Sequence, residues 1–374
     1  MNENIRSMFP VSENYAYLNS AAVGPMPASS ADAVLSQLRS ASENGTEHFP
    51  EWIATKNRAR ALIAEMLNVE PDQIAFMRNT SDGFASVANG LAWRDGANIV
   101  SYANEFPANF YPWRMARDRF GVELRLCKEV NGCVDVDELI SMIDSNTQLV
   151  AISAVQFNSG YRADLERIGK AAREHDALFA VDVIQGLGAM RFDLPAQYVD
   201  IAAGASHKWL CAPEGCGYLY LSERARERVE PTHVGWISVE TPWDFEDRSQ
   251  PFRDNALAWE SGTGPSSLFY GLENSLNLIK ETGIDRIENY LDELSTYVCE
   301  KLTGKDYVID SSRKPGERSA IVCVRHASGQ SCDEIFEHLQ KEKIIVSSRS
   351  GRLRISPHFF NDTTEVDRLI EALP

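Results

Sequence analysis

Short apolar segments alternate with amphipathic helical patterns through most of this 374-residue chain. Segments such as 147–155 (TQLVAISAV) and 177–185 (ALFAVDVIQ) are apolar over nearly their whole length, as expected of strands that are buried on both faces. Helical patterns such as 163–176 (ADLERIGKAAREHD) separate them. Buried strands joined by helices form a mainly parallel sheet covered on both faces. The sequence therefore predicts an α/β fold.

The chain is longer than one ordinary hydrophobic core supports, and its pattern changes toward the C-terminus. Two long helical patterns, 265–282 and 283–302, precede strands and helices that alternate on a smaller scale. We therefore expect an irregular N-terminal segment (1–27), a large domain (28–264) and a smaller C-terminal α+β domain (265–374).

Charge and cysteine content limit the partners and the compartment. A formal net charge of -17 would repel nucleic acid and anionic membranes. No segment approaches the roughly 20 apolar residues of a membrane span, and the first residues, MNENIRSMFP, have no signal-peptide core. The seven cysteines are odd in number and lack zinc-site spacing. We expect free thiols, no metal site and a cytoplasmic location.

A lysine and an aspartate follow two apolar strands that are neighbours in the chain. LFAV ends at Asp182, and DIAAGAS ends just before His207 and Lys208. Ligands bind at the carboxyl ends of parallel strands. An apolar setting frees a lysine amine for Schiff-base chemistry, and a buried carboxylate needs a partner such as a protonated ring nitrogen. The pair predicts pyridoxal phosphate as the cofactor. The alternative for Lys208 is a solvated surface charge.

Other candidates each have a structural alternative. Thr80 and Ser81, between a strand and a helix, suit either a phosphate or a helix cap. Phe106 follows a strand end and suits either stacking on a planar ring or the core. Arg354, on a late strand, suits either a substrate carboxylate or a structural ion pair. Gln185 lies close enough to Asp182 to contact the same ligand.

These segments resemble the class V aminotransferase family of pyridoxal phosphate enzymes, which includes cysteine desulfurases and kynureninase. The resemblance covers nearly the whole chain, and its most specific segment is SHKWLCAPEGCGYLYL. YLNSAAVGPMP, NTSDG, NEFPANFYPW, VDVIQGLG, WESGT and RISPHFFNDTTEVDRL follow the family's order. It implies fold type I, with a mainly parallel seven-stranded sheet between helices and a smaller C-terminal α+β domain. It also implies a homodimer with active sites at the subunit interface.

The resemblance assigns roles to individual residues. It implies that Lys208 forms the Schiff base, that Asp182 pairs with the pyridine nitrogen and that Gln185 contacts the ring hydroxyl. Positions on the phosphate side are matched by Thr80, Ser81, Ser206 and His207, and by Thr263 from the neighbouring subunit. On the substrate side, Arg354 matches the arginine that holds the carboxylate. We also expect Ala22, in YLNSAAVG, to contact the substrate and contribute to side-chain selectivity.

Two departures bear on the reaction. Phe106 stands where the desulfurases stack a histidine, and the segment IIVSSRSGRLRIS lacks their nucleophilic cysteine. Gln156 and Asn158 both suit an asparagine position near the ring. We expect an aminotransferase that acts on a small amino acid, with a lyase of the kynureninase or cystine-lyase kind as the alternative. A desulfurase, an epimerase and a non-catalytic cofactor-binding protein rank behind these.

Overall fold

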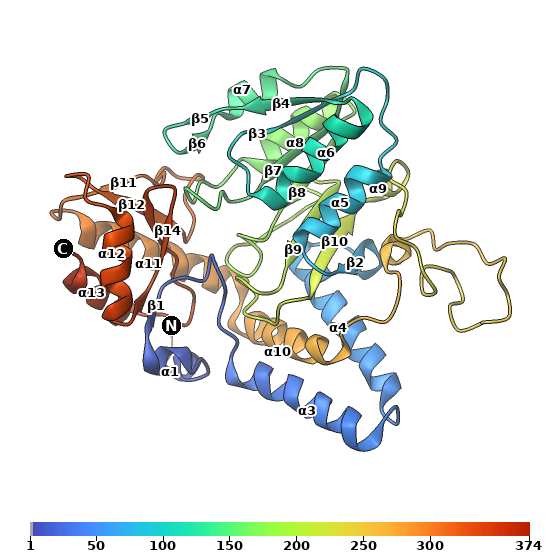
Figure 1. The fold of residues 1–374 in the computed structure, drawn as a ribbon, viewed down its shortest axis with the longest axis horizontal. Helices are drawn as coiled ribbons and strands as arrows, with labels where there is room; N and C mark the ends of the chain where they lie inside the picture. Colours follow the sequence, from blue (N-terminus) through green and yellow to red (C-terminus); the bar gives the residue numbers. More distant parts are fainter. Residues whose placement is uncertain (1–2) are drawn as a thin grey trace.

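The computed structural model describes residues 3–374, and a seven-stranded sheet forms its centre (Figure 1). The strand order is β2-β10-β9-β8-β7-β3-β4. Only β10 runs antiparallel to its neighbours, so the mainly parallel sheet is confirmed. The strands are β2 (Ile74–Met77), β3 (Asn98–Tyr102), β4 (Glu123–Cys127), β7 (Thr147–Ser153), β8 (Leu178–Asp182), β9 (Ile201–Ala205) and β10 (Gly217–Leu221).

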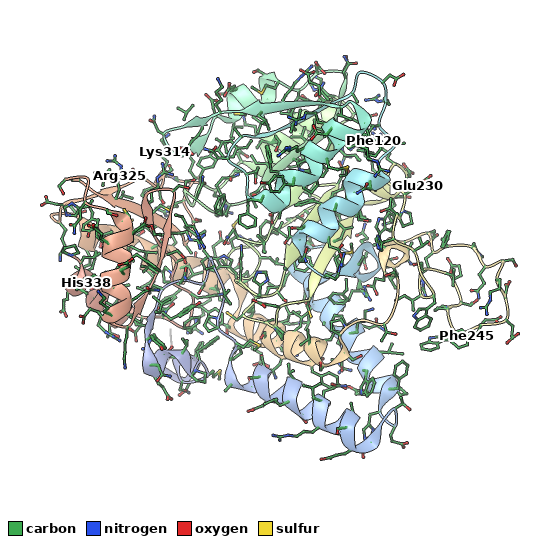
Figure 2. All side chains as sticks on the ribbon, in the orientation of Figure 1. Phe120, Glu230, Phe245, Lys314, Arg325 and His338 are labelled. Atoms are coloured by element: carbon green, nitrogen blue, oxygen red, sulfur yellow. The ribbon has the colours of Figure 1, made fainter. Side chains whose placement is uncertain are left out.

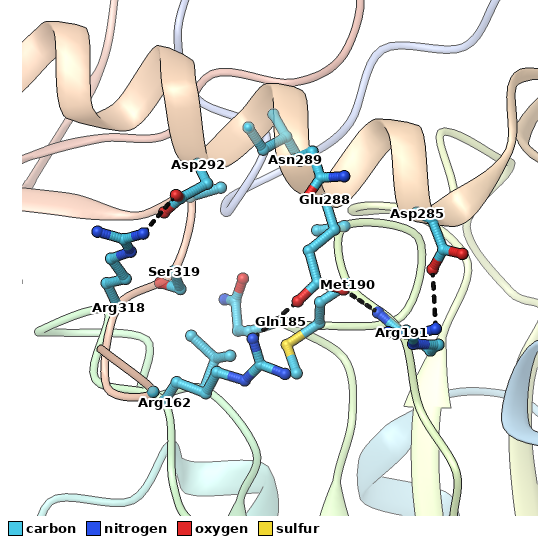
Figure 3. Close-up of a pocket in the computed structure, with 15 residues that line it drawn as sticks. Arg162, Gln185, Met190, Arg191, Asp285, Glu288, Asn289, Asp292, Arg318 and Ser319 are labelled. Atoms are coloured by element: carbon cyan, nitrogen blue, oxygen red, sulfur yellow. Dashed lines mark hydrogen bonds and ion pairs between the residues drawn. The ribbon is translucent and has the colours of Figure 1, made fainter. Parts of the chain in front are cut away.

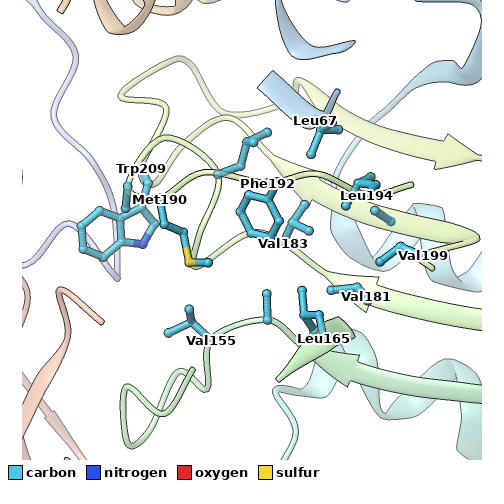
Figure 4. Close-up of a cluster of buried hydrophobic side chains, with 14 of the residues drawn as sticks. Leu67, Val155, Leu165, Val181, Val183, Met190, Phe192, Leu194, Val199 and Trp209 are labelled. Carbon is cyan, nitrogen blue, oxygen red and sulfur yellow. The ribbon is translucent and has the colours of Figure 1, made fainter. Parts of the chain in front are cut away.

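Helices cover both faces of this sheet, because alternate strand residues point to opposite sides. In β8, Val181 joins one hydrophobic core and Ala180 joins the other. Figure 4 shows part of the first core, where Val181 and Val183 pack near Leu165. The first core includes residues of α4 (Phe49–Leu67), α8 (Leu165–Glu174) and α10 (Ser266–Thr282), and the second includes residues of α5 (Thr80–Gly90) and α6 (Tyr111–Phe120).

Local sequence signals explain where several helices begin and end. The side chain of Asp164 accepts a hydrogen bond from the amide of Arg167 and caps α8. Helix α4 has a proline in its first turn and ends at Asn68 in the left-handed conformation. The remaining helices of the large part are α3 (Ala28–Asn44), α7 (Val136–Ser141) and α9 (Glu223–Arg226), with short 3-10 turns at Pro71–Gln73, Pro107–Asn109 and Ala256–Trp259.

The C-terminal part has its own sheet and core, as predicted. Its four strands are antiparallel in the order β11-β12-β15-β14. They pack with three helices around residues such as Leu294, Val324 and Leu369. The elements are α11 (Ile284–Leu302), β11 (Tyr307–Ile309), β12 (Val322–His326), α12 (Cys332–Lys341), β14 (Ser347–Arg349), β15 (Arg352–Ile355) and α13 (Thr363–Ala372).

The N-terminal segment is more ordered than the prediction of irregular structure. It forms α1 (Glu3–Arg6), α2 (Val11–Asn14) and β1 (Ala16–Tyr17), and β1 pairs in parallel with β13 (Ile344–Ile345). The partner strand lies over three hundred residues away, so no local pattern marks this pairing. Helix α10 packs against α3 and α4, although it follows the expected boundary at 265. The division into domains stays a prediction.

Four further features complete the description of the fold. No helix within residues 3–374 is long and apolar enough to cross a membrane. All seven cysteines are free thiols. The segment between α9 and Ala256 projects from the molecule as a long loop, with Phe245 on its outer part (Figures 1 and 2). A small hairpin, β5 (Glu129–Val130) and β6 (Cys133–Val134), lies apart from both sheets.

Candidate active site

Asp182 and Lys208 lie at the carboxyl ends of adjacent parallel strands. Asp182 is the last residue of β8, and Lys208 follows the end of its neighbour β9. Both side chains are buried, with 1% and 7% of their surfaces exposed. The charge of each acts on the pKa of the other, which shows that the fold brings the two groups together. The surface alternative for Lys208 is therefore wrong.

One carboxylate oxygen of Asp182 has no partner. Oδ1 accepts a hydrogen bond from the amide of Ile184 at 2.9 Å, but Oδ2 is buried without one within residues 3–374. Burial raises the pKa of Asp182, whereas the Ile184 amide and the Lys208 charge oppose that rise. A buried acceptor without a donor is costly. The protonated nitrogen of a pyridine ring is a donor of the kind that Oδ2 lacks.

Lys208 carries an amine whose protonated form is disfavoured. Burial lowers its pKa, and Asp182 opposes this shift. The charges of Arg354 and Arg349 lower the pKa further. Nζ lies 5.2 Å from the centroid of the Phe106 ring. A larger share of free amine suits both nucleophilic attack on an aldehyde and proton abstraction.

The turn that carries Lys208 is held by its backbone and by the opening segment. The amide of Ser206 donates to the carbonyl of Cys216 at 3.1 Å, and the amide of Gly24 donates to the carbonyl of His207 at 2.8 Å. The hydroxyl of Ser206 donates to the carbonyl of Pro213, so its proton does not face a phosphate in this structure. Burial and the charge of Lys208 lower the pKa of His207.

The start of α5 has the free groups of an anion site. Asn79 caps this helix, since its side chain accepts a hydrogen bond from the amide of Asp82 at 2.9 Å. The cap alternative for Thr80 and Ser81 is therefore wrong. The hydroxyl of Thr80 is buried without a partner within the described chain, and Ser81 is exposed. Free hydroxyls at a helix N-terminus suit a phosphate.

Phe106 borders the space in front of Lys208. It is 39% exposed, so the alternative of a core aromatic is wrong. Its ring meets the edge of Phe157 with centroids 5.1 Å apart. The ring is thus available to cover a planar ligand near Lys208.

Glu105, next to Phe106, was missed by the sequence analysis. It is 6% exposed, and Oε1 accepts from the amide of Ser153 and from Nε2 of Gln156, each at 2.7 Å. This bonding leaves Oε1 of Gln156 buried without a partner, and Oδ1 of Asn158 is in the same state within residues 3–374. The structure does not choose between these two amides. An acidic residue directly before Phe-Pro at a strand end was the available signal.

Gln185 joins the site to the opening segment. Its Nε2 donates to the carbonyl of Ala21 at 3.0 Å, and its Oε1 accepts from Nε1 of Trp209 at 2.9 Å. Ala22 follows Ala21 and is half-buried. The expected contact of Gln185 with a ring hydroxyl would use the second hydrogen of Nε2 or the second lone pair of Oε1.

Gln185 also lines a separate cavity of about 500 Å³, which Figure 3 shows. The charged side chains of this cavity pair with one another. Their ion pairs are Arg162 with Glu288 at 2.8 Å, Arg191 with Asp285 at 3.2 Å and Arg318 with Asp292 at 2.6 Å. Because these charges are balanced, we place the candidate active site on the Lys208 side of Gln185 instead.

Arg354 is a buried cation without a carboxylate. It is 2% exposed, and it donates to the carbonyl of Phe157 at 3.0 Å and to the hydroxyl of Ser347 at 3.4 Å. Its Nε has no partner within residues 3–374. Burial lowers its pKa to about 10. The structural ion-pair alternative is therefore wrong, and the guanidinium suits an incoming carboxylate.

Thr263 lies in a cavity beside the start of α5 and does not contact Lys208. It is exposed and lines a cavity with Phe269 and the ion pair of Lys56 and Glu260. No interaction within residues 3–374 joins it to Lys208. Its expected role in the site of a neighbouring subunit stays a prediction.

Comparisons with known proteins agree with this geometry. The aminotransferase class-V family matches residues 16–369. A protein of Methanothermobacter thermautotrophicus named probable cysteine desulfurase is 28% identical over 99% of this chain and 97% of its own. A C-DES variant with glycine covalently linked to PLP superposes with a TM-score of 0.91 and 22% identity over 98% of both chains. The cystine C–S lyase C-DES with its product cysteine persulfide gives 0.89 and 23%, over 97% of this chain and 98% of that one.

The chain therefore belongs to the class-V aminotransferase family. The two structural likenesses establish the fold, and the match to the family covers nearly the whole chain. The predictions of this family, of fold type I and of pyridoxal phosphate as the cofactor are confirmed.

Proposed function

We propose that this member of the class-V aminotransferase family is an aminotransferase for a small α-amino acid, with Lys208 as its acid–base group. The observation that carries the proposal is the buried Lys208 amine beside a buried Asp182 with a free Oδ2. Bound pyridoxal phosphate would withdraw electrons from the substrate Cα and carry an amino group. The protein then has to bind and orient the substrate and to move one proton.

The residues present fit this cofactor. Asp182 Oδ2 is an acceptor for the ring nitrogen, and Phe106 offers a partly exposed ring beside Lys208. Thr80 and Ser81 offer hydroxyls at a helix N-terminus for the phosphate. These groups come from three separate strand ends, which supports one shared ligand.

Proton transfer falls to Lys208 and orientation to Arg354. The lowered pKa of Lys208 leaves an amine that can accept the Cα proton and then deliver it to a second carbon nearby. Arg354 would bind the α-carboxylate through Nε and its terminal nitrogens. A carboxylate fixed in this way determines which Cα bond faces Lys208. The same amine can then both take up the proton and deliver it.

The single base favours transamination. Moving one proton from the substrate Cα to a second carbon on the same face needs one acid–base group, whereas expulsion of a poor leaving group needs a second acid. Phe106, directly in front of Lys208, cannot supply a proton. Glu105 is already held by Ser153 and Gln156.

A C–S lyase is the second candidate, because C-DES shares the fold over nearly the whole chain. A persulfide is a better leaving group than a thiol, so cystine cleavage demands less of a second acid. Desulfurase chemistry through a cysteine nucleophile is less well supported, although relatives carry that name. The segment 344–356 has no cysteine, and it forms strands joined by a tight turn.

A panel of amino acids separates these outcomes. We would add each amino acid to the holoenzyme, record the cofactor absorbance and assay the products. Transamination converts the cofactor to its amine form in proportion to the 2-oxo acid formed, and a second 2-oxo acid reverses it. Pyruvate and persulfide from cystine without the amine form would replace this proposal with the lyase. Unchanged spectra with every amino acid would reject both.

We also propose a homodimer in which Thr263 completes the site of the partner. Its exposure supports this arrangement, as does the lack of any interaction with Lys208 within residues 3–374. Mixing Lys208→Ala with Thr263→Ala subunits tests it. A site shared between subunits regains one unaltered copy in the mixed dimer, so cofactor affinity and activity partly return. No recovery after verified subunit exchange would show that Thr263 does not complete the partner's site.

The free thiols support a cytoplasmic location.

A further inference from the structure

A tight hairpin next to Arg354 presents a second arginine. Strands β14 and β15 are joined by Ser350 and Gly351, both in the left-handed region with φ of 51° and 74°. Two such residues form a two-residue hairpin turn that fits the twist of the strands. Arg349, the last residue of β14, is therefore fixed at the strand end rather than carried on a mobile loop.

The strand register places Arg349 on the same face as Arg354. Ser347 pairs with Arg354, and Arg349 pairs with Arg352. Directly paired residues share a face of the sheet, as do residues two apart on one strand. The contact between Ser347 and Arg354 confirms this face, because the guanidinium donates to the Ser347 hydroxyl at 3.4 Å.

Arg349 differs from its neighbour Arg352 in having no ion-pair partner among the described residues. Arg352 lies 3.2 Å from Asp310 and 3.6 Å from Glu129, so its charge is balanced. Arg349 is exposed and forms no ion pair within residues 3–374. An exposed guanidinium without a carboxylate partner among the described residues is free to bind one from a ligand. The position of Arg349 thus favours an incoming anion.

Electrostatics ties Arg349 to the candidate active site. Its charge lowers the pKa of Lys208 and also that of Arg354. Lys208 follows the end of β9 and Arg354 lies within β15, so the charge of Arg349 acts on both sides of the proposed substrate site.

We propose that Arg349 binds a second anionic group on the substrate side chain, so that the site selects α-amino acids with an acidic side chain over neutral ones. The inference rests on the proposed function, because it takes Arg354 as the site of the α-carboxylate. Two arginines, one buried and one at the rim, then bind the two acidic ends of one substrate. Guanidinium forks suit carboxylates and sulfinates alike.

Binding without chemistry is the most direct test. Succinate and butyrate lack an amine, so they can occupy the substrate side of the holoenzyme without reaction. Calorimetry should show succinate binding at least about tenfold more tightly than butyrate, from one additional charge-assisted hydrogen-bonded contact. Arg349→Gln should remove this preference and leave butyrate binding within about twofold. Arg368→Gln, an exposed arginine on α13, is the matched control and should change neither.

Substrate kinetics identify the acidic group. The substrates to compare differ in how far a side-chain anion lies from Cα: aspartate, glutamate, cysteine sulfinate and cystine. Alanine has no side-chain anion and serves as the neutral reference. The proposal predicts that Arg349→Gln raises KM at least about tenfold for the preferred acidic substrate and changes the KM for alanine by no more than about twofold. The effect of Arg349 on the pKa of Lys208 bears on kcat and is shared by all substrates. Equal losses for alanine and the acidic substrates would overturn it.

The two proposals can fail separately. If alanine is transaminated and no acidic compound is preferred, the role of Arg349 is wrong and the proposed function stands. If succinate binding depends on Arg349 but no amino acid reacts, the anion site stands and the proposed function is wrong.

Discussion

Gly24 packs against the backbone of Lys208 with no room for a side chain. A Cβ at position 24 would lie 1.8 Å from the carbonyl oxygen of Lys208, and the Gly24 amide donates to the carbonyl of His207. The glycine of YLNSAAVGPMP is therefore needed for close approach. Through this contact the opening segment helps to set the position of the Lys208 backbone.

Replacing this glycine should disturb the Lys208 turn. We expect Gly24→Ala to lower the free energy of unfolding by about 1–3 kcal/mol, because the backbone must move to admit the methyl group. Thermal and denaturant unfolding would measure the loss. Gly262→Ala is the control, since its nearest neighbour, Trp236 Nε1, would lie 3.5 Å from the new Cβ. Equal stability of the two variants would contradict the close packing.

The charge of Asp182 should make the cofactor-free protein less stable as pH rises. Burial raises its pKa in the folded chain above the unfolded value of about 4. The folded state therefore binds this proton more tightly, and stability falls as pH rises from about 4 toward the folded pKa. Asp182→Asn removes the titrating group. The free energy of unfolding of this variant should exceed that of the natural chain by a margin that grows with pH over that range, to about 1–3 kcal/mol.

The same variant should be the poorer enzyme. Its amide cannot hold a proton on the ring nitrogen as a carboxylate does, so kcat should fall at least about tenfold. Denaturant unfolding at several pH values and steady-state kinetics provide the two measurements. A variant with unchanged kcat would argue against Asp182 as the partner of the ring.

Phe106 should contribute to cofactor affinity by stacking. Aromatic contacts are worth about 0.5–1.5 kcal/mol beyond burial, so Phe106→Ala should weaken cofactor binding about three- to tenfold. Fluorescence titration of the cofactor-free protein measures this. Phe120 on α6 is the matched control, because it is 40% exposed against 39% for Phe106. If Phe120→Ala weakened binding as much, the ring of Phe106 would have no specific role.

The strand ends of the site could be predicted from sequence because they depend on local patterns. Apolar runs ending at Asp182 and before Lys208 identify both residues, and the sheet brings them together. The roles of residues 79 to 81 are harder to predict from sequence, because each of these residue types is a common helix N-cap. Only the backbone geometry shows that Asn79 caps α5 and leaves Thr80 free.

Long-range contacts could not be predicted in this way. The packing of Gly24 on Lys208 and the bond from Arg354 to Phe157 join segments far apart in the chain. Arg349 and Arg352 look equivalent in the sequence SSRSGRLR. One is paired and the other is not, because Asp310 and Glu129 approach only Arg352.

The central claim is that Lys208 is the lysine that carries the cofactor. Reduction of the holoenzyme with borohydride, followed by digestion and mass spectrometry, tests it most directly. We predict a pyridoxyl group on the peptide that contains Lys208, and none on the protein after Lys208→Ala. A cofactor fixed to another lysine of the natural chain, or to none, would contradict the account.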